Sequence, residues 1–341
     1  MGVIFGQLGN WEKALVEFRQ ALEMEPDNEV NYANLGSTYI ALDRAAEGEE
    51  VYRQAEERKL EGELLISNRY ESAFLKGDAV KMAQLFSMAM GKPGTEDLLL
   101  AIQADTEAWQ GKLKSARELT QRAMDSARHS DAKETAASYQ AEAALRDVEV
   151  GRKEAARAEA MAALRLAPNL EVRAMGALAL ARIGDVKAAE RLAAEMDKAF
   201  PLDTLVQRYW LPTIRAAIAL ERKDANQAIE HLTQTKTIEL GTPSNYPLFL
   251  CPVYMRGEAY LALHDGKRAA GEFQKFIDHP GMVATFAWGS LARLGSARAY
   301  ALQGEAVRAR AAYRDFLTLW KDADPDIPIL KQAKAEYAKL Q

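Results

Sequence analysis

The side chains that most often do chemistry in proteins are sparse and scattered in this chain of 341 residues. Its four histidines and single cysteine match no zinc-binding spacing and no H-E-x-x-H sequence. Cys251 stands between Leu250 and Pro252 with no histidine nearby. We expect it to be a buried structural thiol, because a reactive thiol needs a base or positive charge beside it. We therefore predict no metal site and no catalytic residue.

One acidic motif imitates a calcium site and then departs from it. Asp322, Asp324 and Asp326 match the start of an EF-hand loop. Ile327 stands where that loop needs glycine, and Ala333 stands where it needs a bidentate glutamate. We expect these acids to lie in a rigid turn before a helix N-terminus, where the helix dipole favours negative charge. No Walker A or G-x-G-x-x-G sequence occurs either, so we predict no bound cofactor.

The composition favours a helical protein without a nucleic-acid surface. Apolar residues make up 48% of the chain, and many are alanine, the strongest helix former. The formal net charge is -5, with acids and bases interspersed, so there is no basic tract to neutralise phosphates. No apolar run reaches the roughly 20 residues of a membrane span. A single cysteine fits a reducing compartment, so we expect a cytoplasmic location, or an extracytoplasmic one if an upstream span tethers the chain.

A recurring pattern of small, aromatic and turn residues divides the chain into pairs of helices. The clearest copy consists of Ala14, Phe18 and Pro26, followed by Tyr32, Leu35, Gly36 and Tyr39. A small residue such as Gly36 allows the first helix to approach its partner closely, and Pro26 ends the preceding helix. Turn residues recur at Gly9, Gly77, Gly111, Gly151, Gly184, Lys223 and Gly304. The pattern predicts about nine helical hairpins and a closing helix over 327–340, with no sheet.

This pattern resembles the tetratricopeptide repeat, whose signatures are W-x2-L-G-x2-Y and A-x3-F…P. The resemblance implies an all-α protein, an α-solenoid of helical hairpins that forms a right-handed superhelix. It also implies a scaffold that binds a protein or peptide partner rather than an enzyme. Gly2 and Phe5 occupy the places of Gly36 and Tyr39 one repeat earlier. We therefore expect a truncated first repeat and a chain that is a piece of a longer protein.

A narrower resemblance concerns the C-terminal repeat regions of bacterial serine/threonine kinases and winged-helix regulators. The segments that carry it are 67–70, 73–78, 91–97, 103–108 and 319–328. The resemblance implies the regulatory or sensory part of a bacterial signalling protein. The kinase itself is not expected in this chain, because it has no H-R-D or D-F-G sequence.

Proline and glycine between 238 and 252 suggest an irregular connection. We predict an N-terminal array over 1–240, the connection over 241–252, and C-terminal hairpins with a capping helix over 253–341. One continuous array is the alternative.

First helices line the concave face of tetratricopeptide arrays, and the resemblance therefore implies a set of partner-binding residues. These are Ser67, Glu71, Asp105, Trp109, Trp210, Thr213, Tyr254, Glu258 and Arg298. For the two tryptophans the alternative is packing against neighbouring helices. A second hypothesis for the whole chain is a small-molecule sensor, with its ligand inside the superhelix near Tyr246, Phe249 and Tyr254.

Overall fold

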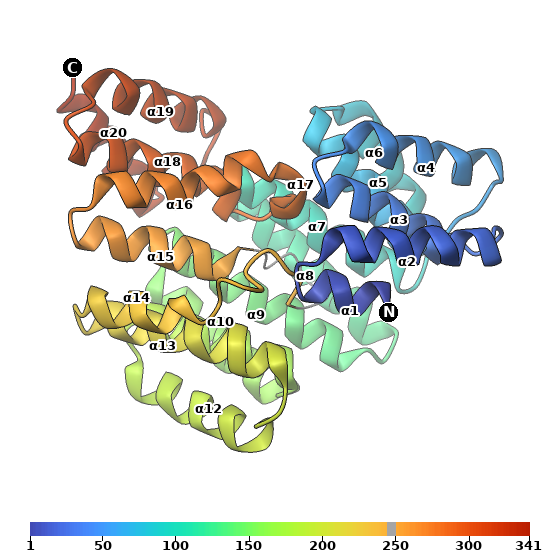
Figure 1. Cartoon of the computed structure of the whole chain (residues 1–341), viewed down its shortest axis with the longest axis horizontal. Helices are drawn as coiled ribbons and strands as arrows, with labels where there is room; N and C mark the ends of the chain where they lie inside the picture. The colour runs from blue at the N-terminus through green and yellow to red at the C-terminus, as the bar shows by residue number, and fades with distance from the viewer. Residues whose placement is uncertain (244–249) are drawn as a thin grey trace.

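The computed structural model describes residues 1–243 and 250–341, and within these ranges all regular structure is helical (Figure 1). Nine pairs of helices follow one another as antiparallel hairpins. The first five are α1 (Gly2–Gln7) with α2 (Trp11–Met24), α3 (Glu29–Ala41) with α4 (Ala45–Glu57), α5 (Glu63–Lys76) with α6 (Ala79–Ala89), α7 (Thr95–Trp109) with α8 (Leu113–His129), and α9 (Lys133–Glu149) with α10 (Lys153–Leu166). The other four are α11 (Leu170–Ile183) with α12 (Val186–Ala199), α13 (Leu211–Glu221) with α14 (Ala225–Thr233), α15 (Cys251–Ala262) with α16 (Gly266–Asp278), and α18 (Trp288–Leu302) with α19 (Ala306–Leu319).

Three further helical segments stand outside the hairpins. They are a π-helical turn η1 (Val206–Trp210), the short α17 (Pro280–Val283) and the final α20 (Pro328–Ala338). The all-α solenoid and the closing helix are therefore confirmed. Tyr246 and Phe249, two of the residues placed near a small-molecule ligand, lie outside the described residues. The division of the chain at 241–252 stays a prediction.

Each hairpin turns at one residue with positive φ, a conformation that glycine adopts most readily. These residues are Gly9, Asp43, Gly77, Gly111, Gly151, Gly184, Lys223, His264 and Gly304. Several second helices then begin at an aspartate that caps the helix, as Asp78 does by accepting from the amide of Lys81 at 2.9 Å. Seven of these nine turn residues are those read from the sequence, and Asp43 and His264 are the two that were not.

Within a hairpin, glycine allows the close helix approach expected from the repeat pattern. A Cβ atom at Gly36 would lie 2.1 Å from the ring of Tyr52 on the second helix. The later pair of Gly257 and Phe273 repeats the arrangement, with a Cβ to ring distance of 2.7 Å. No side chain beyond hydrogen fits at either glycine without moving a buried ring.

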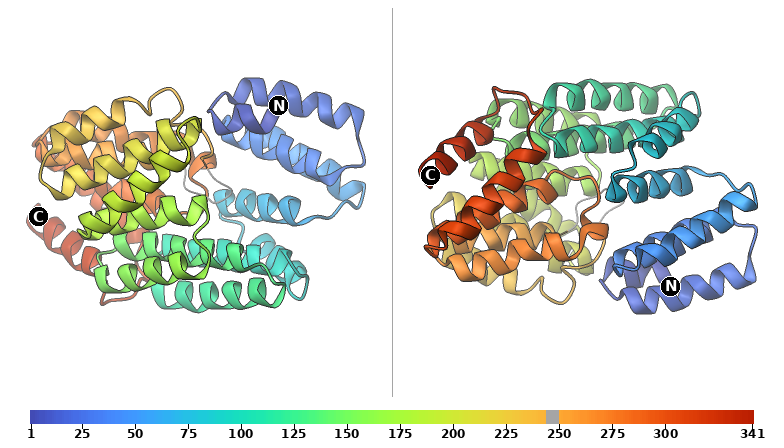
Figure 2. Two further views of the ribbon diagram at one scale, coloured as in Figure 1. Left: turned by 90° about the horizontal axis from the view of Figure 1, so that it is seen from below. Right: turned by 90° about the horizontal axis from the view of Figure 1, so that it is seen from above.

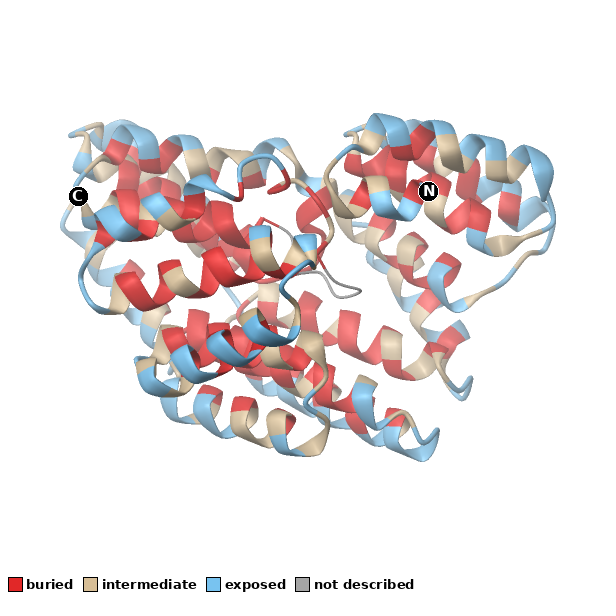
Figure 3. Ribbon diagram, turned by 60° about the horizontal axis from the view of Figure 1, so that its bottom comes forward, coloured by how far each residue is buried: buried red, intermediate tan, exposed pale blue. Residues whose placement is uncertain are grey.

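The two helices of a hairpin differ in burial, which shows which one faces inward (Figure 3). Thirteen of the 17 residues of α9 are buried, compared with three of the 14 residues of α10. First helices therefore form the inner layer of the superhelix and second helices the outer layer. This is the arrangement that stacked repeats use to make their core continuous.

The superhelix closes on itself, so that hairpins far apart in sequence lie side by side (Figures 1 and 2). On one side, α17 packs against α3 and α5. The contact is tight, because a Cβ atom at Gly281 would lie 2.3 Å from the carbonyl oxygen of Ile40. His279 Nδ1 lies 2.9 Å from a carboxylate oxygen of Asp43 at the same seam. We call this contact the α17 seam.

A second contact joins the C-terminal hairpin to the fourth hairpin. The indole N–H of Trp320 donates to the carbonyl oxygen of Trp109 at 3.0 Å. A carboxylate oxygen of Asp324 accepts from the amide of Lys114 at 2.9 Å, in the first turn of α8. Asp324 therefore caps a helix N-terminus, but on a helix about 200 residues away in sequence rather than on the one that follows it.

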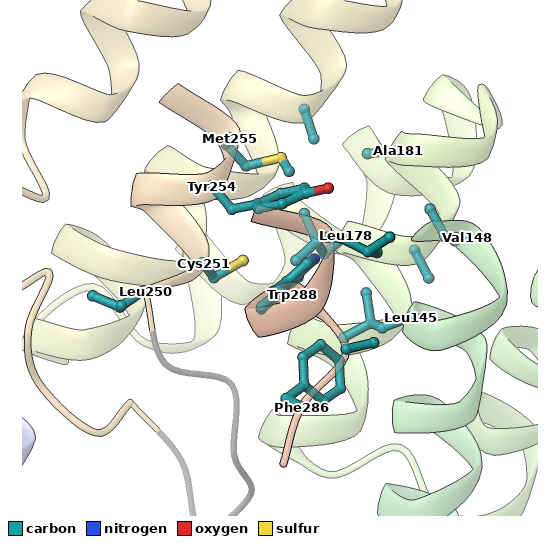
Figure 4. Close-up of a cluster of buried hydrophobic side chains, with 14 of the residues drawn as sticks. Leu145, Val148, Leu178, Ala181, Leu250, Cys251, Tyr254, Met255, Phe286 and Trp288 are labelled. Atoms are coloured by element: carbon teal, nitrogen blue, oxygen red, sulfur yellow. The ribbon is translucent and has the colours of Figure 1, made fainter. Parts of the chain in front are cut away.

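The interior of the middle hairpins is filled by the chain itself (Figure 4). The Tyr254 ring of α15 stacks on Trp288 of α18 with centroids 5.7 Å apart, and Phe286 meets Trp288 edge-on at 4.7 Å. Leu145 of α9 and Leu178 of α11 complete this cluster. The concave face is therefore packed core in this region and not an open groove.

Candidate functional site

A cavity of about 210 Å³ lies between the inner helices of the N-terminal hairpins and two segments from later in the chain, Thr242 and helix α17. Helices α3, α5, α7 and α9 form its wall on one side, and α17 with Thr242 closes the other. Its apolar lining includes Trp11, Leu64, Leu98, Ile102 and Met282. We call this space the central cavity.

Three acids from consecutive inner helices line the central cavity. They are Glu71 of α5, Asp105 of α7 and Glu142 of α9. No lysine or arginine is among the lining residues that the structure describes. The cavity is therefore acidic and set in an apolar wall.

One guanidinium lies behind these acids and compensates one of them. Arg146 is ion-paired with Asp105, and it donates a second hydrogen bond to the hydroxyl of Thr120. Asp105 and Arg146 are both almost fully buried, with 1% and 4% of their surface exposed. The charge of Arg146 also acts on Glu142, one turn away on the same helix, so one guanidinium serves two acids of the cavity wall.

The acids are held in an environment that disfavours their charge. Burial, and then the charge of Asp105, raises the pKa of Glu71 to about 7. The same two causes raise the pKa of Glu142 well above its usual range, against the opposing charge of Arg146. Glu142 is 1% exposed, and its carboxyl group is hydrogen-bonded to that of Asp105. A hydrogen bond between two buried acids requires that one of them holds a proton, which agrees with the raised pKa of Glu142.

A second hollow, of about 480 Å³, lies beside the α17 seam. Its apolar residues include Phe74, Met82, Trp109 and Val283. Phe74 meets the ring of Trp109 edge-on at 5.3 Å, and the guanidinium of Arg293 lies 5.7 Å from the ring centre. We call this space the Trp109 groove.

A separate cluster of charged side chains surrounds Arg182 of α11. Arg182 pairs with Glu149 at 2.7 Å and with Glu258 at 2.5 Å. Burial raises the pKa of Glu149 to about 7, against the opposing charge of Arg182. Both acids have the same arginine as partner, so the loss of Arg182 would leave two acids of this network without their cation.

The structure distributes the predicted site residues over several environments. Ser67, Glu71 and Asp105 meet in the central cavity, and Trp109 lies in its groove. Glu258 joins the Arg182 network, whereas Arg298 pairs with Glu336 at 2.9 Å.

The other three predicted residues, Trp210, Thr213 and Tyr254, have 5% or less of their surface exposed. Placing them on an open face does not fit this conformation, because the superhelix closes over them and the chain fills its own interior.

Most residues of the central cavity were not predicted from the sequence, and Glu142 and Trp11 are two examples. Glu142 carried a usable signal, since Glu142 and Arg146 are charged residues one turn apart in an alanine-rich helix. Such charges on an inner helix must find partners inside the protein. Trp11 carried no such signal. Its indole N–H donates to the carbonyl oxygen of Leu240 at 2.7 Å, a contact that exists only because the superhelix closes.

Comparison with protein families identifies the repeats at the start of the chain. A model of the tetratricopeptide repeat matches residues 1–28 and 31–61, which contain the first two hairpins. The start of the chain therefore consists of tetratricopeptide repeats. Its repeats support a role as a protein–protein interaction scaffold.

Solved structures similar to this chain include three with low sequence identity. A tetratricopeptide repeat protein from Parabacteroides merdae is 14% identical with a TM-score of 0.36, covering 83% of this chain and 95% of its own. Yeast Tom70 is 13% identical with a TM-score of 0.44, and the match covers 99% of this chain and 87% of the Tom70 chain. The Cut9 and Hcn1 assembly of the APC/C is 12% identical with a TM-score of 0.44, covering 99% and 74%.

Identities and TM-scores this low carry no argument about function. The comparison with curated proteins found no match to the chain. None of the helices in the described ranges has the length and apolar character to cross a membrane.

Proposed function

We propose that this chain is a scaffold that holds a peptide segment of a protein partner in the Trp109 groove. The observation that supports it is an apolar hollow of about 480 Å³ with a half-buried tryptophan at its wall. Tryptophan and neighbouring arginine are the residue types that most often dominate binding energy at protein interfaces. Met82 adds a flexible side chain that adapts to different partners.

The wider role that we propose is the regulatory arm of a bacterial signalling protein that carries a kinase or a transcription regulator. Its support is the resemblance of segments such as 91–97 and 319–328 to the repeat regions of those proteins. We also propose that it works in the cytoplasm, in keeping with its single cysteine.

A peptide library displayed on phage tests the scaffold function. Enriched peptides should bind the wild-type chain, and Met82→Glu should weaken them at least about tenfold, because it places a charge in the apolar groove. Leu202→Glu is the matched control, since Leu202 is 94% exposed and lies outside the groove. Peptides that bind Met82→Glu as tightly as the wild type would place the partner surface elsewhere.

A second proposed function is sensing of a small molecule inside the superhelix. The observation that favours it is the central cavity, which lies between the inner helices on one side and α17 with Thr242 on the other. Since Tyr254 is buried in the core, the cavity between α5, α7 and α9 takes the place of the region around that tyrosine.

A further inference from the structure

We infer that the partner segment held in the Trp109 groove carries an acidic side chain next to an apolar one, and that Trp109 and Arg293 together bind its carboxylate. The inference rests on the proposed scaffold function and names the chemistry of the partner. Three observations carry it: the positive charge of the groove wall, two neighbouring side chains with unused N–H donors, and the apolar surface around them.

The charge of the groove selects the sign of the partner. The charged side chains among its described lining residues are Lys76 and Arg293, and none is acidic. Lys76 is ion-paired with Glu49 of α4, whereas Arg293 has no ion pair among the described residues. Burial lowers the pKa of Arg293, against the opposing charge of the more distant Asp315 on α19. An acidic partner would give this half-buried guanidinium the carboxylate that it lacks.

The indole of Trp109 lies next to this guanidinium, and both groups lie beside Gly289 of α18. The centre of the guanidinium is 5.7 Å from the centre of the Trp109 ring. Nη1 of Arg293 donates to the carbonyl oxygen of Gly289 at 2.6 Å, and a Cβ atom at Gly289 would lie 2.9 Å from the indole nitrogen of Trp109.

Both of these groups have N–H donors that the protein does not use. The bond to Gly289 takes one of the five N–H groups of the guanidinium. The indole N–H of Trp109 has no acceptor among the described residues. A carboxylate has two oxygens, so it can accept from the indole and the guanidinium at once.

The remainder of the groove suits an apolar side chain beside that carboxylate. Phe74 of α5 meets the ring of Trp109 edge-on, and Met82 of α6 lines the same wall. Val283 of α17 adds apolar surface from the other side of the α17 seam. The volume of about 480 Å³ lies within the usual range of ligand pockets. A segment with an acid next to an apolar residue would therefore contact both parts of the wall.

A phage-displayed library of random dodecapeptides, selected on the whole chain, supplies the probes for a test. Groove binders are the enriched peptides whose affinity falls at least about tenfold with Met82→Gln. This variant is neutral, so the assignment of groove binders does not itself favour one sign of charge. We expect groove binders to contain aspartate or glutamate next to an apolar residue well above the frequency in the library.

Fluorescence anisotropy of synthetic groove binders then tests the two contacts. Arg293→Gln should weaken them at least about tenfold, and so should replacing the acid of the peptide by its amide. The two changes together should cost little more than either alone, because they remove the same contact. Arg293→Lys keeps the charge and should keep part of the preference for the acid. Trp109→Phe keeps an aromatic ring without the N–H, and should weaken the acid about threefold or more and the amide less.

The matched control is Arg314→Gln, since Arg314 is an exposed arginine of α19 outside the groove. It removes the same charge and should leave every affinity unchanged.

Each other outcome contradicts a defined statement. Groove binders without an excess of acids, or with unchanged affinity for a folded Arg293→Gln variant, would overturn the acidic partner while the scaffold function survived. If no enriched peptide depended on Met82, the scaffold function and this inference would both fall. Hydrocinnamate bound as tightly as the acidic peptides would assign the groove to a small carboxylic acid. A wild-type dimer that Arg293→Gln dissociates would assign it to a second copy of the chain, and either result would overturn the partner named here.

Discussion

At the scale of single residues, the molecule is unusual in how many acids it holds inside. Glu71, Asp105, Glu142 and Glu149 all lie on inner helices. Two of them share the central cavity with Asp105, and Glu149 is paired with Arg182. Burying a charged side chain costs free energy, so each of these acids is expected to be paired, hydrogen-bonded or protonated.

The raised pKa of Glu71 makes stability depend on pH. Its pKa is about 7 in the folded chain, above that of an unfolded glutamate, because of burial and the charge of Asp105. The folded state therefore holds this proton more tightly, so the contribution is full below about pH 4.5 and is lost as pH rises through 7. Burial, with a smaller effect of this carboxylate charge, also raises the pKa of Tyr52 and of Tyr70. We expect Glu71→Gln to reduce the loss of unfolding free energy between pH 5 and pH 8 by on the order of 2–3 kcal/mol.

Urea unfolding at the two pH values measures this effect. Glu154→Gln is the control, because its side chain is exposed. The pKa of Glu149 is also about 7, so both variants should keep part of the fall in unfolding free energy between pH 5 and pH 8. The same change in unfolding free energy between the two pH values in Glu71→Gln and the wild type would show that Glu71 does not hold a proton in the folded chain.

At the scale of elements, the hairpins could be predicted from the sequence and the closing segments could not. The turn residues and the pair of Gly36 and Tyr52 are local signals, because each acts within one hairpin. Helix α17 and the contact of Trp320 with Trp109 depend on the summed rotation of many hairpins, which no local pattern records. For the same reason Ser67, Glu71 and Asp105 could be assigned to an inner face, but not the burial of Trp210 or Tyr254.

Glycine inside the helices provides a matched test of hairpin packing. Gly36→Ala should destabilise the chain by about 1–3 kcal/mol, because its new Cβ would overlap the ring of Tyr52, 2.1 Å away. Gly271→Ala in α16 should instead stabilise it by up to about 1 kcal/mol, since nothing lies within 4 Å and alanine favours helix. Thermal unfolding of both variants measures the difference. Equal stability would show that the ring of Tyr52 moves away freely.

At the scale of the whole molecule, closure changes how a repeat protein holds together. In an open solenoid each repeat contacts only its neighbours, so stability is a sum of local terms. Here α17 contacts α3 and α5, and α18 contacts α7. The N-terminal hairpins are therefore stabilised from both sides, and the central cavity exists only while these contacts hold.

Opening the α17 seam should widen the molecule without unfolding its helices. Gly281→Val would force side-chain atoms against the carbonyl oxygen of Ile40, 2.3 Å from the first of them. We expect a larger radius of gyration in small-angle scattering and an unchanged helical circular dichroism spectrum. Gly271→Val, at an open position of α16, should leave the radius unchanged. A Gly281→Val variant with the wild-type radius would show that the seam adapts without opening.

The contacts of Trp320 with Trp109 and of Asp324 with Lys114 also limit how this protein can change by gene duplication. Open arrays gain and lose repeats readily, because a new unit disturbs only two neighbours. In this chain an extra hairpin between α8 and α19 would rotate and displace one partner of each contact away from the other. The number of hairpins between these contacts is therefore fixed by geometry. We expect sequence changes to accumulate in the outer helices while the number of repeats stays constant.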